Sequence, residues 1–166
     1  MEFELTESGR LDGIFKYCNA NGIHVSVDAS STAYGDPQCL IQRIGSDATY
    51  WESSCKGRDP FVQFDFGDNR VMVNGYTLVS AQNAMCDKVP TDWLLAGSND
   101  QDDWVILDDI AGNSDLRGAH QIVSFFCDSQ NEHFRYIRLQ MPELNTDGDW
   151  TFRLGSVELF GELSVN

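Results

Sequence analysis

The clearest pattern in the chain is an alternation of apolar and polar residues in VQFDF, positions 62–66. This period of two is typical of a strand with one buried face. The turn-forming stretch 67–70 (GDNR) follows, and a long apolar run occupies 71–80. Two strands joined by a short turn predict an antiparallel hairpin at this point.

Similar short apolar or alternating segments recur along the chain, separated by clusters of Gly, Pro, Asn, Asp and Ser. About nine strands are predicted in this way, and no regular alternation of strands with helices interrupts them. The predicted strands are 23–27, 39–44, 62–66, 71–80, 93–96, 104–107, 121–127, 134–141 and 157–160. The pattern predicts an all-β protein, an antiparallel β-sandwich or a barrel.

One segment has the helical period instead. Leu11, Ile14, Phe15 and Cys18 follow the i, i+3, i+4, i+7 spacing of a single helix face. Ser8 is a candidate cap and Asn21-Gly22 a stop signal. We predict one short N-terminal helix packed outside the sheets, with residues 1–10 as an extension and 11–166 as a single domain.

The net charge of the protein limits which binding partners it can have. Lys and Arg number 11 against 26 Asp and Glu, a net charge of -15. Such a surface repels nucleic acid and anionic membranes, so we expect neither as a partner. Two interpretations stay open: the charge keeps the protein soluble, or it forms a site for a cation or a basic partner.

The cysteines indicate the cellular compartment in which the protein is found. Their number is five, so they cannot all pair, and no two of them have a C-x-x-C spacing. The five are Cys18, Cys39, Cys55, Cys86 and Cys127. The N-terminal residues MEFELTESGR also lack a basic region followed by an apolar one. We therefore expect reduced thiols and a cytoplasmic protein.

Motifs of catalysis are missing from the sequence. It contains no G-x-S-x-G, and its three histidines are isolated from one another. The acidic stretch 100–103 lacks the turn glycine of an EF-hand and is followed by Trp104. We expect a protein without enzymatic activity.

Taken together, several segments in this order resemble the discoidin domain, also called the coagulation-factor C-type (F5/8 type C) domain, of the galactose-binding-like jelly rolls. They are VSVDASST, YWES, FVQFDFG, VNGYTLVS, DWLLAGSNDQDDWVIL, FRYIRLQM and LGSVELFGEL. The resemblance covers roughly Gly13 to Leu163, and it implies a jelly-roll β-sandwich. Secreted members join their ends by a disulfide, whereas this chain lacks such a pair and looks like the intracellular branch found in protists and beside BTB domains.

The resemblance implies that ligands bind on loops at one end of the sandwich, here 31–37, 45–52 and 83–90. A sugar site needs an apolar face and a few fixed polar groups. The candidate residues are Tyr34, Asp36, Tyr50, Glu52, Asn83, Met85 and Lys88. The alternative is that these are ordinary loop residues. Trp51, Trp93 and Trp104 match core positions of the family. Trp150 is the tryptophan expected to be exposed, and it is a further candidate for ligand binding.

The resemblance also implies a calcium site beneath these loops. The matching ligands would be Asp47, Thr49 and Glu158. Where calcium-binding members have Asp-Gly, this chain has Ile41-Gln42-Arg43, and an arginine opposes a divalent cation. The alternative is that Glu158 forms an ion pair with Arg153.

Two functions follow from these expectations. One is a binding module for glycans of the galactose type. The other is an intracellular protein-interaction module, within a scaffold or cytoskeletal assembly, for which self-association stays open. Membrane binding would need apolar spikes beside basic residues, and Met85 with Lys88 supplies little of that.

Overall fold

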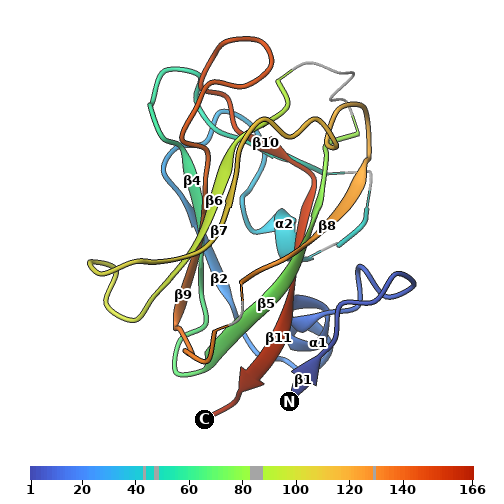
Figure 1. The fold of residues 1–166 in the computed structure, drawn as a ribbon, viewed down its shortest axis with the longest axis vertical. Helices are drawn as coiled ribbons and strands as arrows, with labels where there is room; N and C mark the ends of the chain where they lie inside the picture. Colours follow the sequence, from blue (N-terminus) through green and yellow to red (C-terminus); the bar gives the residue numbers. More distant parts are fainter. Residues whose placement is uncertain (43, 47–48, 83–87, 129) are drawn as a thin grey trace.

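The computed structural model describes residues 1–166 except 43, 47–48, 83–87 and 129 (Figure 1). The strands form two antiparallel sheets that face each other, with a two-stranded ribbon at one end. This confirms the predicted antiparallel β-sandwich. No helix in these described residues is long and apolar enough to cross a membrane.

The first sheet has the strand order β1-β11-β5-β8 and the second β2-β4-β9-β6-β7, while β10 and β3 form the ribbon. Strands of the first sheet are β1 (Glu2–Phe3), β5 (Arg70–Val79), β8 (Ile122–Phe126) and β11 (Ser156–Ser164). Those of the second are β2 (Ser26–Ala29), β4 (Phe61–Asp65), β6 (Trp93–Ser98), β7 (Val105–Ile110) and β9 (Tyr136–Gln140). The ribbon consists of β3 (Trp51–Glu52) and β10 (Arg153–Leu154). The short β1, β3 and β10 have no periodicity of their own in the sequence.

The two termini lie together at the end of the sandwich opposite the ribbon (Figure 1). β1 pairs antiparallel with β11, and the Met1 ammonium donates to the Leu163 carbonyl at 2.9 Å. The predicted N-terminal extension is therefore tied to an edge of the first sheet.

The predicted hairpin of β4 and β5 is wrong. β4 pairs with β2 and β9, whereas β5 pairs with β11 and β8. The intervening turn carries the chain from one sheet to the other, and Gly67 adopts a left-handed φ of 65° there. Alternation reports which face of a strand is buried, and both strands bury apolar residues in the same core. It does not report whether consecutive strands pair or face each other.

The core between the sheets is rich in aromatic residues. Trp51 and Trp93 are fully buried, as predicted. The Trp93 indole N–H donates to the Tyr76 hydroxyl at 2.8 Å, and that hydroxyl donates to the Asp108 carboxylate at 2.6 Å. Each polar atom of these large side chains thus has a partner. The core prediction is wrong for Trp104, which is partly exposed and packs on the outside of the second sheet.

The predicted helix is present as α1 (Ile14–Ala20), and it buries Ile14, Phe15 and Cys18 as the periodicity indicates. It begins after Gly13 and not after Ser8. The Glu158 carboxylate of β11 accepts hydrogen bonds from the amides of Phe15 and Lys16, at 2.8 and 3.1 Å. A side chain remote in sequence therefore supplies the acceptor for the first helical turn.

The predicted strand at 39–44 is wrong: Cys39–Gln42 form the short helix α2. The Asp36 carboxylate accepts from the Gln38 amide, and the Asp36 carbonyl accepts from the Cys39 amide, which starts a helical turn at Pro37. Leu40 and Ile41 are buried by it. A four-residue apolar run does not distinguish a strand from a helical turn. Similarly, the strand predicted at 23–27 begins later, as β2.

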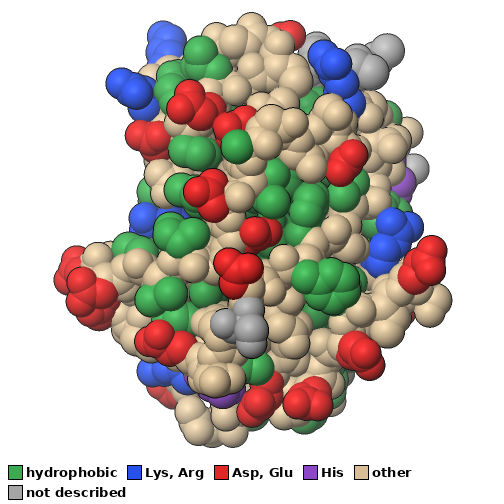
Figure 2. Space-filling model, viewed as in Figure 1, with side chains coloured by type: hydrophobic (Ala, Val, Ile, Leu, Met, Phe, Trp, Pro, Cys, Tyr) green, Lys and Arg blue, Asp and Glu red, His purple; other side chains and the backbone are tan. Residues whose placement is uncertain are grey.

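Acidic side chains are spread over the face seen in Figure 2, with apolar side chains between them. The large negative charge is therefore not gathered into one patch on this face.

Candidate functional site

The loops at the ribbon end of the sandwich bring several predicted site residues together. This loop end is defined here as residues 30–37, 49–60, 88–92 and 143–153, near the top of Figure 1. Tyr34 and Tyr50 stack, with ring centroids 4.5 Å apart and an interplanar angle of 18°. Tyr34 is 54% exposed, while Tyr50 is partly buried beneath it. The pair forms a small aromatic surface open to solvent.

Backbone pairing fixes the position of Tyr34. Its amide donates to the Glu52 carbonyl at 3.3 Å, and the Glu52 amide donates to the Tyr34 carbonyl at 3.0 Å. The next residue, Gly35, has φ +76°, and a Cβ there would lie 2.0 Å from the Tyr50 carbonyl oxygen. Only glycine allows the loop to pass this close to β3. The loop and its tyrosine are thus held against the ribbon.

An ion pair lies beside the tyrosines. The Arg153 Nε donates to the Glu52 Oε2 at 2.7 Å, and the side chains are only 11% and 20% exposed. The Arg153 guanidinium also lies 5.7 Å from the centroid of the Tyr50 ring. The alternative prediction that Arg153 pairs with Glu158 is wrong, because the antiparallel register of β10 and β3 places Arg153 opposite Glu52.

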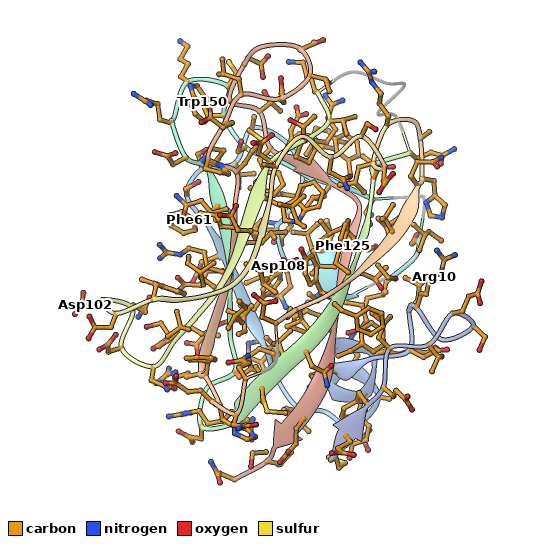
Figure 3. All side chains as sticks on the ribbon, viewed as in Figure 1. Arg10, Phe61, Asp102, Asp108, Phe125 and Trp150 are labelled. Carbon is orange, nitrogen blue, oxygen red and sulfur yellow. The ribbon has the colours of Figure 1, made fainter. Side chains whose placement is uncertain are left out.

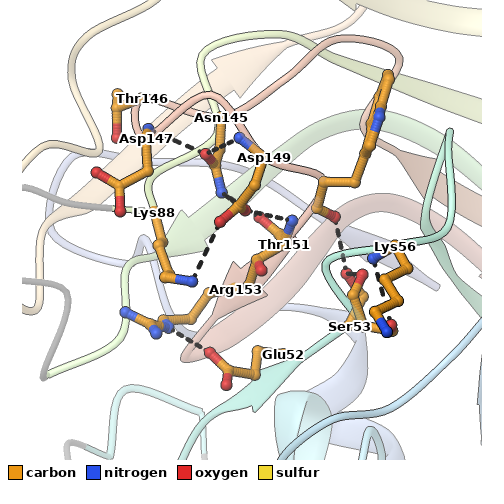
Figure 4. A network of polar contacts seen from close by, with 12 residues as sticks. Glu52, Ser53, Lys56, Lys88, Asn145, Thr146, Asp147, Asp149, Thr151 and Arg153 are labelled. Carbon is orange, nitrogen blue, oxygen red and sulfur yellow. Dashed lines mark hydrogen bonds and ion pairs between the residues drawn. The ribbon is translucent and has the colours of Figure 1, made fainter.

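A second charged pair adjoins the first (Figure 4). The Lys88 ammonium lies 3.2 Å from an Asp149 carboxylate oxygen. Burial opposes ionisation of Asp149, but hydrogen bonds from Thr151 and Lys88 outweigh it and lower the pKa of this carboxyl. Asn145 accepts from the Asp149 amide and donates to its carboxylate, so the loop carrying Asp149 is closed by its own side chains. The Lys88 prediction thus falls in a fixed polar network.

The remaining candidates stand apart from this cluster. Asp36 is exposed on the Tyr34 loop and caps α2. Trp150 is partly buried, and the Arg58 guanidinium lies 5.6 Å from its ring centroid. Asn83 and Met85 lie outside the described residues.

Of the residues predicted to hold calcium, Glu158 does not fit that role. One oxygen of Glu158, Oε1, accepts from the amides of Phe15 and Leu159, both at 2.8 Å, and Oε2 accepts from Lys16. Because amides already occupy both of its oxygens, this carboxylate is a poor ligand for a hard cation. Its burial raises its pKa to about 7. The hydroxyl of Thr49 lies beside the Cys39 thiol, and Asp47 is outside the described residues. Within the described ranges, no three His, Cys, Asp or Glu side chains are arranged to hold a metal ion.

Sequence reasoning missed Arg153 as a site residue. It is the single charged residue between Trp150 and Val157. A lone charge among uncharged residues indicates an ion pair with a residue elsewhere in the chain. Its partner could not be identified without the register of the ribbon.

Two facing antiparallel sheets with loops gathered at one end define a jelly-roll β-sandwich domain. The model of the F5/8 type C domain family matches residues 26–155, so the chain belongs to this family. No curated protein matches the sequence.

Solved structures share the fold at low identity. CBM32-3 from a family 31 glycoside hydrolase of Clostridium perfringens superposes with a TM-score of 0.65 at 14% identity, over 83% of this chain and 91% of that one. CpGH89CBM32-5 of the same organism, solved with GalNAc-β-1,3-galactose, gives 0.65 at 16%, over 86% and 96%. The family 32 CBM of NanJ from C. perfringens, solved with galactose, gives 0.63 at 13%, over 82% and 93%. At these identities the likeness establishes the fold.

Proposed function

We propose that the protein is a non-catalytic carbohydrate-binding module whose site is the loop end. The observation that carries the proposal is the Tyr34–Tyr50 stack, half exposed and fixed beside a nearly buried Arg153–Glu52 ion pair. Structures of the same fold with bound galactose or GalNAc-β-1,3-galactose support it.

The chemistry of the loop end suits a sugar. A pyranose presents C–H groups that pack on an aromatic ring and hydroxyls that need fixed donors and acceptors. The exposed Tyr34 supplies the ring, Arg153 and Lys88 are donors, and Glu52 and Asp149 are acceptors. Because the polar groups already hold one another in place, little side-chain entropy is lost when a ligand binds. A galactose-type sugar is the specific ligand that we propose.

A glycan array followed by titration calorimetry with galactose tests this. Tyr34→Ala removes the exposed ring while leaving the ion pairs in place, and we expect it to abolish or strongly reduce binding. Phe126→Ala is the matched control, because Phe126 is a 73% exposed aromatic residue on β8 of the first sheet and is not part of the loop end. This substitution should leave binding unchanged. Parallel measurements with calcium and with chelator show whether a metal contributes.

A blank array in both conditions would refute the proposal. It would favour the alternative of a protein-interaction module, which pull-down from cell extract would then examine.

A further inference from the structure

A hollow on the outer face of the second sheet is lined by Arg138, an arginine that has no carboxylate partner among the described residues. The hollow has a volume of about 140 Å³ and lies on the sheet strands, apart from the loop end. Its lining residues are Leu94, Ala96, Trp104, Ile106, Arg138 and Gln140. Phe61 and Asp102, labelled in Figure 3, mark this outer side of the sheet.

The hollow follows from one small residue in a row of large ones. On the sheet, Ala96 of β6 lies opposite Arg138 of β9 and opposite Ile106 of β7. The pairing of β6 with β7 also shifts register between Leu95 and Ala96. A methyl group between two long side chains leaves a gap that neither neighbour fills.

Arg138 is held rigidly at one wall. Its guanidinium carbon lies 3.9 Å from the Phe61 ring centroid and 4.1 Å from that of Trp104. Its Nε and Nη2 donate to the Gln63 Oε1 at 3.2 and 2.8 Å. Gln63 is only 6% exposed and donates in turn to Gln101 at 2.9 Å. Two aromatic rings and a buried amide therefore fix the plane and direction of the guanidinium.

The charge of Arg138 is not balanced locally. Burial lowers its pKa, which is the sign of a partly desolvated cation. In the part of the chain that the structure describes, no carboxylate lies within ion-pair distance of it, and its Nη1 donates to no protein acceptor. This is notable in a chain with 26 acidic residues. One edge of a fixed cation is thus available to an outside acceptor.

We propose that this hollow is a second ligand site, which binds the carboxylate of a hexuronic acid in an acidic glycan. The free guanidinium edge matches the two oxygens of a carboxylate. Leu94 and Ile106 offer an apolar wall for the C–H face of the sugar ring, and the Gln140 amide can bond a hydroxyl. The hollow shares no residue with the loop end, so either site can fail while the other holds.

Titration calorimetry with methyl β-D-glucuronide, and with methyl β-D-glucoside as the neutral analogue, tests the proposal. We expect the glucuronide to bind about tenfold or more tightly than the glucoside. Ala96→Leu fills the hollow without touching the arginine, and Arg138→Lys keeps the charge but loses the planar edge. Each should weaken glucuronide binding by about tenfold or more. Tyr34→Ala should leave it unchanged, and circular dichroism with thermal melting confirms that each variant is folded.

Equal affinity of the native protein for both sugars, or for neither, would overturn the proposal. So would glucuronide binding that survives Ala96→Leu. Binding that Tyr34→Ala removes and Ala96→Leu retains would assign the acidic sugar to the loop end and likewise overturn the second site.

Discussion

Glu158→Gln should remove a pH dependence from the stability of this fold. Glu158 is completely buried in β11, and burial raises the pKa of its carboxyl from 4.5 to about 7, against the lowering effect of the amides that donate to it. A raised pKa means that the folded state favours the protonated acid. The contribution to the free energy of unfolding is therefore complete below pH 4.5 and is lost as pH rises through about 7.

The size of the effect follows from the shift. At 1.36 kcal/mol per pKa unit, the native protein should lose about 3 kcal/mol of stability from this group between pH 4.5 and 8. Glutamine does not titrate, so the variant lacks that slope. It also turns an NH2 group toward helix amides that need an acceptor, which costs about 1–3 kcal/mol. The variant should therefore be less stable than the native protein at pH 5 and closer to it at pH 8.

Urea unfolding followed by tryptophan fluorescence, at pH values from 5 to 8, measures both effects. Carboxyls with lowered pKa values, such as Asp65 and Asp149, titrate below this window. Glu143→Gln is the control, because Glu143 is an exposed loop residue, and it should follow the native curve. If Glu158→Gln shows the same slope as the native protein, the carboxylate does not titrate as we reason and the argument fails.

Two further substitutions test the packing. Gly35→Ala should lower the melting temperature well beyond Gly112→Ala: both glycines have positive φ, but only at Gly35 does a Cβ collide with the Tyr50 carbonyl, while nothing lies within 4 Å at Gly112. Equal losses would show that the close approach is unimportant. Tyr76→Phe removes a hydroxyl that accepts from the Trp93 indole, and we expect about 1–3 kcal/mol lower stability in urea unfolding because a buried N–H loses its acceptor. An unchanged midpoint would mean that water or a shifted side chain replaces it.

The fold class could be predicted from the sequence because burial of one face of a strand produces an alternation of apolar and polar residues. The predicted strand 62–66 is present, one residue earlier, as β4 (Phe61–Asp65), and the buried face of α1 is the one that its period of 3.6 predicts. Pairing between strands produces no such pattern. The hairpin prediction failed because both β4 and β5 bury one face in the same core. The strand predicted at 39–44 failed because Asp36 and Pro37 start a helical turn there.

The candidate site was predictable only in part, for a related reason. Tyr34, Tyr50 and Glu52 come together because the loops that carry them meet at the ribbon. The partner of Glu52 depends on the register of β3 and β10, two strands of two residues each. Trp104 was expected in the core because its position matches a core position of the family. In the structure it instead lies against Arg138 together with Phe61, a residue more than 40 positions away in the sequence. A contact between residues so far apart could not be predicted from the sequence.

The pairing of β1 with β11 has a practical consequence for how the protein can be presented to a ligand. Both termini emerge at the end opposite the loops (Figure 1). A tag or support attached to either terminus would therefore point the loop end outward into solution. The outer face of the second sheet would then stand sideways to the support. Immobilised protein should keep the loop end fully accessible, while dense coating would first crowd the hollow around Arg138.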